Sequence, residues 1–234
     1  MFSRFPMWWF FGFMVFSMVV RFVTGIFRIQ KVASQASGTA KNLGFTFTPW
    51  TNDPRVSPQV DTELFRKDNL KTFRNLMTGT YAGMETKVFD YSCSSGNVQN
   101  PSTWTQTVAV YSKDVDLPLF TLQPESIMLK LLDALQHQRV NLDYPAGASH
   151  HYALHGPDKD RIKPLFTQNV VSFLESLDRS KEWIIEGSGK QLVIYRYAHR
   201  VKADDLQDFL QETSSIAQSL FGLLAAKAAH SSGV

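Results

Sequence analysis

The sequence predicts an α+β protein in which an N-terminal transmembrane helix precedes one domain with an antiparallel sheet and two to four packed amphipathic helices. Three observations lead to this prediction. Residues 5–27 form a nearly continuous apolar run. Alternating β-forming residues fill the middle of the chain, and apolar residues at helical spacing recur near its end. We expect a membrane anchor helix with its juxtamembrane extension in residues 1–42, the α+β domain in 43–226 and a frayed tail in 227–234.

The apolar run is long enough for one bilayer crossing. A hydrocarbon core about 30 Å thick needs ~20 apolar residues in a helix, and Phe5 to Phe27 supplies 23. Its Phe, Val and Ile residues favour insertion by about 5 kcal/mol in sum, whereas Arg21 costs ~3 kcal/mol at mid-bilayer. The predicted membrane-anchor residues are Trp8, Trp9, Phe13, Phe16, Val20 and Arg21.

Two other interpretations of the run stay open, a helix buried in a core and a signal peptide. Residues 34–36 offer a small-x-small cleavage site, but the run exceeds the usual 7–15 apolar residues of a signal peptide. Because Arg21, Arg28 and Lys31 follow the run, the positive-inside rule predicts a single-pass protein of the inner membrane with a cytoplasmic domain. A periplasmic domain is the other possibility.

Composition narrows the partners. Residues 1–42 carry five basic residues and no acidic one, so the remainder has 19 Lys and Arg against 21 Asp and Glu. A near-neutral domain without a basic stripe argues against nucleic-acid binding. Cys93 is the single cysteine, which excludes an intramolecular disulfide. The predicted partners are the lipid bilayer and other membrane-protein subunits, and no cofactor or metal is predicted.

The first helix is expected to continue past the run to Asn42, because small and apolar residues recur three and four positions apart. Gly44 then ends it. Small side chains let another element approach closely. The candidate interaction residues here are Ala33, Ala36 and Ala40.

The next segments are short. Residues 45–48 alternate like a strand, and residues 49–58 contain several structure breakers and are expected to be irregular. Leu70, Phe73 and Leu76 lie three positions apart, which favours a helix with one apolar face.

The central part is predicted to be β-structure. Residues 80–92 and 103–113 are two strands joined by a polar hairpin loop. Phe89 and Tyr91 would share one face of the first strand. Residues 117–122 follow, and their proline favours an edge position.

Helices dominate the second half. One opens at Pro124-Glu125, with Ile127, Leu131 and Leu135 as its buried stripe, and another near Pro164. Residues 183–186 and 192–198 are expected to form a hairpin turned by residues 187–190. The last helix begins near Asp204 and has a long apolar face that closes the fold or docks on a partner. Its candidate interaction residues are Phe209, Ile216 and Leu220.

The histidines are the first candidates for chemistry. On a helix, His151 and His155 would be one turn apart and could hold a metal together with His150. The segment looks extended, however, and has no carboxylate or cysteine at ligand spacing. Surface or half-buried imidazoles are the preferred interpretation.

Other chemical motifs are incomplete. Cys93 has no base nearby in the sequence. Residues 187–189 lack the strand-to-helix context of a nucleophile elbow, and residues 79–83 lack the lysine and hydroxyl of a phosphate loop. Asp90 is an acid within an apolar strand, and it is either a functional carboxylate, an outward-facing residue or a cap for the adjoining loop. We expect a binding protein rather than an enzyme.

Several short motifs occur together in a fixed order. They are residues 79–83 (GTYAG), 88–91 (VFDY), 106–111 (QTVAVY), 117–125 (LPLFTLQPE), 152–158 (YALHGPD) and 165–166 (LF). The series resembles a group of uncharacterised bacterial proteins, often membrane-anchored, with a Phe-Asp-Tyr strand and a Leu-Pro…Pro-Glu helix entrance. The resemblance covers about residues 40–225 and implies no activity and no catalytic residues. Residues 92–94 depart from it, where the group has a further aromatic residue or a glycine.

The function predicted from the sequence is a membrane-anchored, non-catalytic accessory or interaction subunit of a larger membrane complex. The second hypothesis is a small-molecule or lipid-binding domain at the bilayer surface, with Trp104, Tyr91 or Tyr111 lining a pocket. The third is a hydrolase that uses Asp90 or the histidines, which requires these side chains to converge within hydrogen-bond reach.

Overall fold

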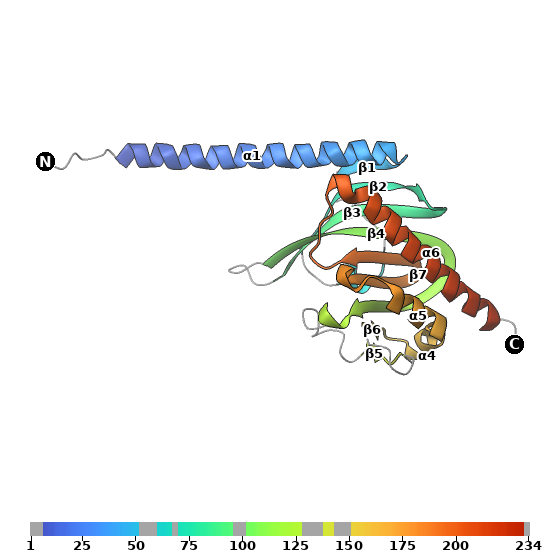
Figure 1. Cartoon of the computed structure of the whole chain (residues 1–234). Coiled ribbons are helices and arrows are strands. Elements are labelled where there is room, and N and C mark those ends of the chain that lie inside the picture. Colours follow the sequence, from blue (N-terminus) through green and yellow to red (C-terminus); the bar gives the residue numbers. More distant parts are fainter. Residues whose placement is uncertain are drawn as a thin grey trace.

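A seven-stranded antiparallel sheet with helices on one face forms the folded domain, and a long helix extends from it at the N-terminal end (Figure 1). The structure is a computed structural model of the 234-residue chain, and it describes residues 7–51, 60–66, 70–95, 102–127, 138–142 and 151–231. The architecture is therefore α+β.

Helix α1, Met7–Asn42, continues well beyond the apolar run before Gly44, with a φ of 73°, ends it. No helix in the described part of the chain is both long enough and apolar enough to span a membrane. The predicted transmembrane helix and the predicted single-pass location in the inner membrane are corrected on this finding.

Four strands follow one another as an antiparallel meander. They are β1 (Thr46–Thr51), β2 (Leu70–Tyr81), β3 (Met84–Ser95) and β4 (Ser102–Pro124). The predicted hairpin is found over residues 84–92 and 103–113, with Phe89 opposite Val108 and Tyr91 opposite Gln106. Residues 80–83 belong instead to β2 and its turn, and residues 117–122 are part of β4 rather than a separate strand. The turn between β2 and β3 has Ala82 and Gly83 in the left-handed region.

Strand β4 is the longest strand and the centre of the sheet. Residues 108–112 pair with both β3 and β7 (Trp183–Arg196), and residues 121–122 pair with both β7 and β6 (Tyr152–His155). Strand β7 therefore occupies one edge of β4, whereas β3 and β6 share the other. Strand β5 (Arg139–Val140) pairs with β6 at the end of the sheet.

The predicted hairpin over residues 183–198 is wrong, because β7 is one strand that pairs with β4 from Ile185 to Tyr195. Its glycines, which are typical of a turn, are present because of close packing at Gly187 and a left-handed backbone at Gly189. A Cβ on Gly187 would lie 2.2 Å from a ring carbon of Phe120, and Gly189 has a φ of 55°. The register shift between Ser112 and Leu117 is taken up by extra residues in β4.

The helix predicted from Leu70, Phe73 and Leu76 is also wrong, because these residues lie in β2. A β-bulge lies between Arg74 and Met77, which pair with Asp90 and Val88. The extra residue changes the alternation, so that Phe73 and Leu76 pack in the same cluster although they are three positions apart. The bulge thus produces a helix-like spacing in a strand.

The helices cover one face of the sheet. They include α4 (Lys159–Ile162), α5 (Gln168–Ser176) and α6 (Leu206–Ser231), together with the 3-10 turns Lys163–Leu165, Arg179–Lys181 and Ala203–Asp205. The helices predicted near Pro164 and Asp204 are found as α5 and α6. Helix α6 lies across the strands (Figure 1), and its Leu210, Leu220 and Phe221 are fully buried in the larger core.

The other face of the sheet carries a second, aromatic-rich cluster that includes Phe89, Tyr91 and Tyr195. Residues 60–66, with the short helix α2 (Glu63–Arg66), pack on it. Of the helix predicted from Pro124, only residues 125–127 are described, while Leu131 and Leu135 lie outside the described residues.

Candidate functional site

The apolar segment of α1, residues 13–20, holds nearly all the large exposed apolar side chains of the described residues. Seven of its eight side chains are large, apolar and exposed, from 42% for Val20 to 74% for Phe13. At about 100° per residue these side chains point in every direction around the helix. The segment stands away from the domain in Figure 1, and such a concentration of exposed apolar surface is typical of an interaction site.

The other predicted anchor and interaction residues lie elsewhere. Trp8 and Trp9 are helical, but their side chains and that of Ala33 lie outside the described residues. Ala36 and Ala40 are buried against the domain. Phe209, Ile216 and Leu220 are 4%, 5% and 0% exposed, so these side chains of α6 pack in the domain's own core.

A small hollow lies at the end of the sheet where β5 and β6 separate. The two strands pair only at Arg139–His155 and Val140–Leu154, and the chain then diverges at Asn141 and Leu142. We call this space the β5–β6 hollow. It has a volume of about 140 Å³ and is lined by Arg139, Val140, Asn141, Leu142, Tyr152, Ala153 and Leu154.

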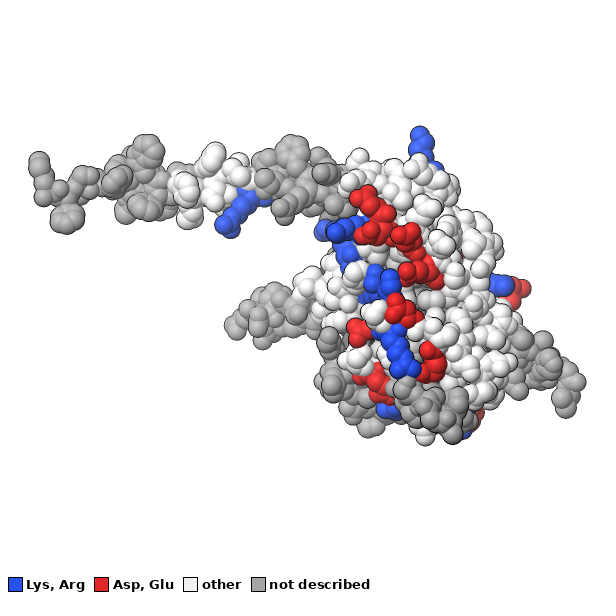
Figure 2. Space-filling view, in the orientation of Figure 1, with Lys and Arg blue, Asp and Glu red and all other residues white. Residues whose placement is uncertain are grey.

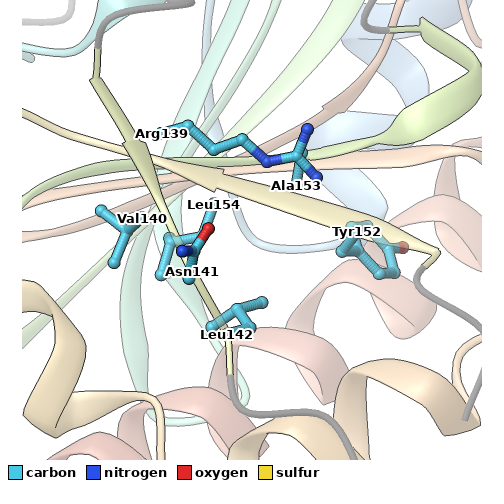
Figure 3. A pocket seen from close by; sticks show the side chains of 7 residues that line it. All are labelled: Arg139, Val140, Asn141, Leu142, Tyr152, Ala153 and Leu154. Atoms are coloured by element: carbon cyan, nitrogen blue, oxygen red, sulfur yellow. The ribbon is translucent and has the colours of Figure 1, made fainter.

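The lining combines an apolar wall with polar groups at the rim. Figure 3 shows Asn141 and Leu142 on the segment that continues β5, and Tyr152 on β6 across from them. Arg139 is held by an ion pair of 2.5 Å between its Nη2 and Oε1 of Glu125. Both side chains are partly exposed, and together they are electrically neutral.

Asp90 is the centre of a buried polar network rather than a lone carboxylate. It accepts hydrogen bonds of 2.8 Å from Asn75 Nδ2, Thr107 Oγ1 and Arg200 Nε. Thr107 Oγ1 also accepts one from the backbone N–H of Val201. Every oxygen of Asp90 is thus engaged in joining the segment after β7 to the sheet, which is a structural role.

Glu186 is a second buried carboxyl, which the sequence analysis did not single out. Its oxygens accept hydrogen bonds from the hydroxyl of Tyr195 (2.7 Å) and from the backbone N–H of Leu64 (3.1 Å). Burial raises the pKa of Glu186, against the lowering effect of these hydrogen bonds. Burial and the neighbouring Glu186 also raise the pKa of Tyr195. Tyr91 donates to the carbonyl of Leu64, so the sheet holds residues 60–66 from two sides.

The histidines do not converge. His155 lies in β6 with its Nε2 3.4 Å from Nε2 of Gln123, and His151 lies just before the strand against the ring of Tyr152. Four residues of extended chain span about 13 Å. His150 lies outside the described residues, and among those described no group of three or more His, Cys, Asp or Glu is placed to share a metal ion.

The aromatic pocket hypothesized for Trp104, Tyr91 and Tyr111 does not form from these residues. Tyr91 and Trp104 belong to the aromatic cluster, whereas Tyr111 lies in the larger core, where its hydroxyl is 2.7 Å from Oγ1 of Thr213. Cys93 is buried beside Tyr91 in the aromatic-rich cluster.

Charge is interleaved on the surface. Figure 2 shows basic and acidic side chains side by side down one face of the domain. The ion pairs of the domain surface include Lys181–Glu212 (3.2 Å) and Arg179–Glu175 (2.8 Å).

No family model matches the chain, and comparison with curated proteins finds none similar to it. Among solved structures, the crystal structure of the mycobacterial trehalose monomycolate transport factor A is similar to this chain, with a TM-score of 0.55. The two are 15% identical, and the match covers 81% of this chain and 94% of the other. At this identity the likeness shows the fold alone.

Proposed function

We propose that this chain is a non-catalytic accessory subunit in lipid transport, and that it binds helical subunits of a larger assembly through residues 13–20 of α1. The observation that carries the proposal is the exposure of seven large apolar side chains around this segment. The likeness in fold to trehalose monomycolate transport factor A supports the connection with lipid transport.

The energetics favour a partner that surrounds the helix. Burying a large apolar side chain contributes roughly 1.5–3 kcal/mol, so the segment as a whole contributes about 10–20 kcal/mol. This offsets an association cost of about 4–15 kcal/mol. A single partner helix would cover one side only, whereas a groove between several helices would cover all sides.

The test compares the full-length chain with the variant Phe13→Gln/Phe16→Gln/Val20→Gln. We expect the wild type to purify under mild conditions in a complex with defined other subunits, and the variant to lose them while its domain melts at the same temperature. Native mass spectrometry measures the assembly. The control variant Gln35→Ala changes an exposed residue of the same helix and should keep the complex.

Two results would contradict this proposal. One is a wild-type chain that remains alone at every protein concentration tested. The other is a variant that retains all partner subunits. If the purified wild type floats with protein-free liposomes and the variant does not, residues 13–20 of α1 bind lipid instead of protein subunits.

A second candidate function is a small-molecule or lipid-binding domain, and the β5–β6 hollow favours it. Its volume of about 140 Å³ is well below the roughly 300–1,000 Å³ of pockets for drug-sized ligands. An engineered cavity of about 150 Å³ holds one benzene ring. The hollow therefore suits one ring or the end of a chain rather than a whole lipid. Saturable binding of a small ligand at these residues is the test.

A further inference from the structure

We propose that the β5–β6 hollow binds a neutral sugar ring. The inference rests on the second, ligand-binding candidate and is independent of the partner surface on α1. It names the chemical class of ligand, which follows from the size of the hollow, its charge and the pairing of polar with apolar groups around it.

Size restricts the ligand to one ring. The volume of about 140 Å³ is close to that of a cavity that holds six ring carbons. Beyond the Val140–Leu154 pair the next residues in register, Asn141 with Ala153 and Leu142 with Tyr152, form no strand pairs in this described part of the sheet. The hollow thus lies where the pairing of β5 with β6 ends, with Asn141 and Leu142 on one side and Tyr152 across from them (Figure 3).

Charge argues against an anionic ligand. The guanidinium of Arg139 already has the carboxylate of Glu125 at 2.5 Å. Among the described lining residues the one charged side chain is therefore neutralised, and an anion would have to displace Glu125 from it. An uncharged ligand that accepts a hydrogen bond from Arg139 leaves the ion pair intact.

The polar groups argue against an acyl chain. A hydrocarbon would cover the Asn141 amide and part of Arg139 without offering them hydrogen bonds, and burying polar groups in this way is unfavourable. Sugar hydroxyls can donate to the amide oxygen of Asn141 and accept from Arg139, both of which line the hollow. The C–H face of the ring then packs on Leu142 and Tyr152.

The experiment is an NMR titration of the isotope-labelled full-length chain with three probes: methyl β-glucoside, hexan-1-ol and hexanoate. We expect saturable shifts with the glucoside, centred on residues 139–142 and 152–154. A ligand of about a dozen heavy atoms should have a Kd in the millimolar range. Leu142→Trp should fill the hollow and abolish the shifts, and Asn141→Ala should weaken binding about fivefold or more.

Asn169→Ala, which changes an exposed asparagine on α5, is the matched control and should bind as the wild type does. Thermal melting separates loss of binding from loss of fold in each variant. Saturable shifts with hexan-1-ol alone, with hexanoate alone, or with no probe up to about a hundred millimolar would each overturn the sugar assignment. If the full-length chain binds the glucoside but forms no complex with other subunits, only the accessory-subunit proposal is overturned.

Discussion

At the scale of single residues, Glu186 places an ionisable group where water does not reach. It is 1% exposed and lies on strand β7, between the Tyr195 hydroxyl and the backbone of Leu64. Because burial raises its pKa, the folded protein holds a proton that the unfolded chain has already lost. This group therefore stabilises the fold most at acidic pH.

We predict a pH-dependent difference between the wild type and Glu186→Gln. The stabilisation from the raised pKa is fully present below the unfolded value of about 4.5 and is lost as pH rises through the folded pKa. Glu186→Gln, which cannot ionise, should lose this dependence. Urea unfolding measured from pH 4 to 8 checks it, with the exposed Glu85→Gln as control. Parallel curves for wild type and Glu186→Gln would contradict the prediction.

Asp90 leads to a prediction of a different kind, because its partners are buried while its counter-ion is not. Asp90→Ala leaves the Asn75 amide and the Thr107 hydroxyl without an acceptor, which should cost about 1–3 kcal/mol in the free energy of unfolding. Arg200→Ala removes a side chain that is 43% exposed and should cost about 0–1 kcal/mol. Chemical denaturation of both variants measures the difference, and equal losses would assign the effect to the ion pair.

At the scale of elements, the two glycines of β7 serve different purposes, so alanine should act differently at each. In Gly187→Ala the new methyl would meet the Phe120 ring at 2.2 Å, and this overpacking should cost about 1–3 kcal/mol. Gly189 has open space around it but a φ of 55°, so Gly189→Ala should cost about 1 kcal/mol. Thermal unfolding of the two variants is the measurement. A larger loss at Gly189 would contradict this assignment.

Elements with a regular period could be predicted from the sequence, and those that a bulge distorts could not. The spacing of apolar residues predicted α6, and the alternation predicted most of β3 and the first half of β4. In β2 the bulge beside Asn75, whose φ is 52°, breaks the alternation and mimics a helix. In β7, Gly187 is typical of a turn, but it is there because the ring of Phe120 packs on it. This contact joins residues far apart in the sequence.

At the scale of the whole molecule, strand β4 is the part most enclosed by partners. Residues 108–111 are fully buried and pair with strands on both sides. We predict that their amide hydrogens exchange most slowly, and that those of the edge strand β1 exchange much faster. Native-state hydrogen exchange read by mass spectrometry checks this order. Equal protection of β1 and β4 would contradict it.

The candidate surfaces could be predicted only in part. The apolar run that contains residues 13–20 is plain in the sequence, but the position of its side chains relative to the domain is not. The β5–β6 hollow left no signal, because it arises where two short strands stop pairing. In the sequence Glu186 lies beside a glycine-rich segment typical of a turn, whereas in the structure it lies within the continuous strand β7. The preceding Ile184 and Ile185 indicate a buried strand.

The double pairing of β4 also bears on how the chain is made. Strand β7 begins at Trp183, long after β4 ends at Pro124, so a nascent chain leaves one edge of β4 without its neighbour until most of the protein has emerged from the ribosome. An unpaired edge of that length invites pairing with other chains. Translation products that stop short of β7 should therefore be substrates for chaperones and proteases rather than partly working domains.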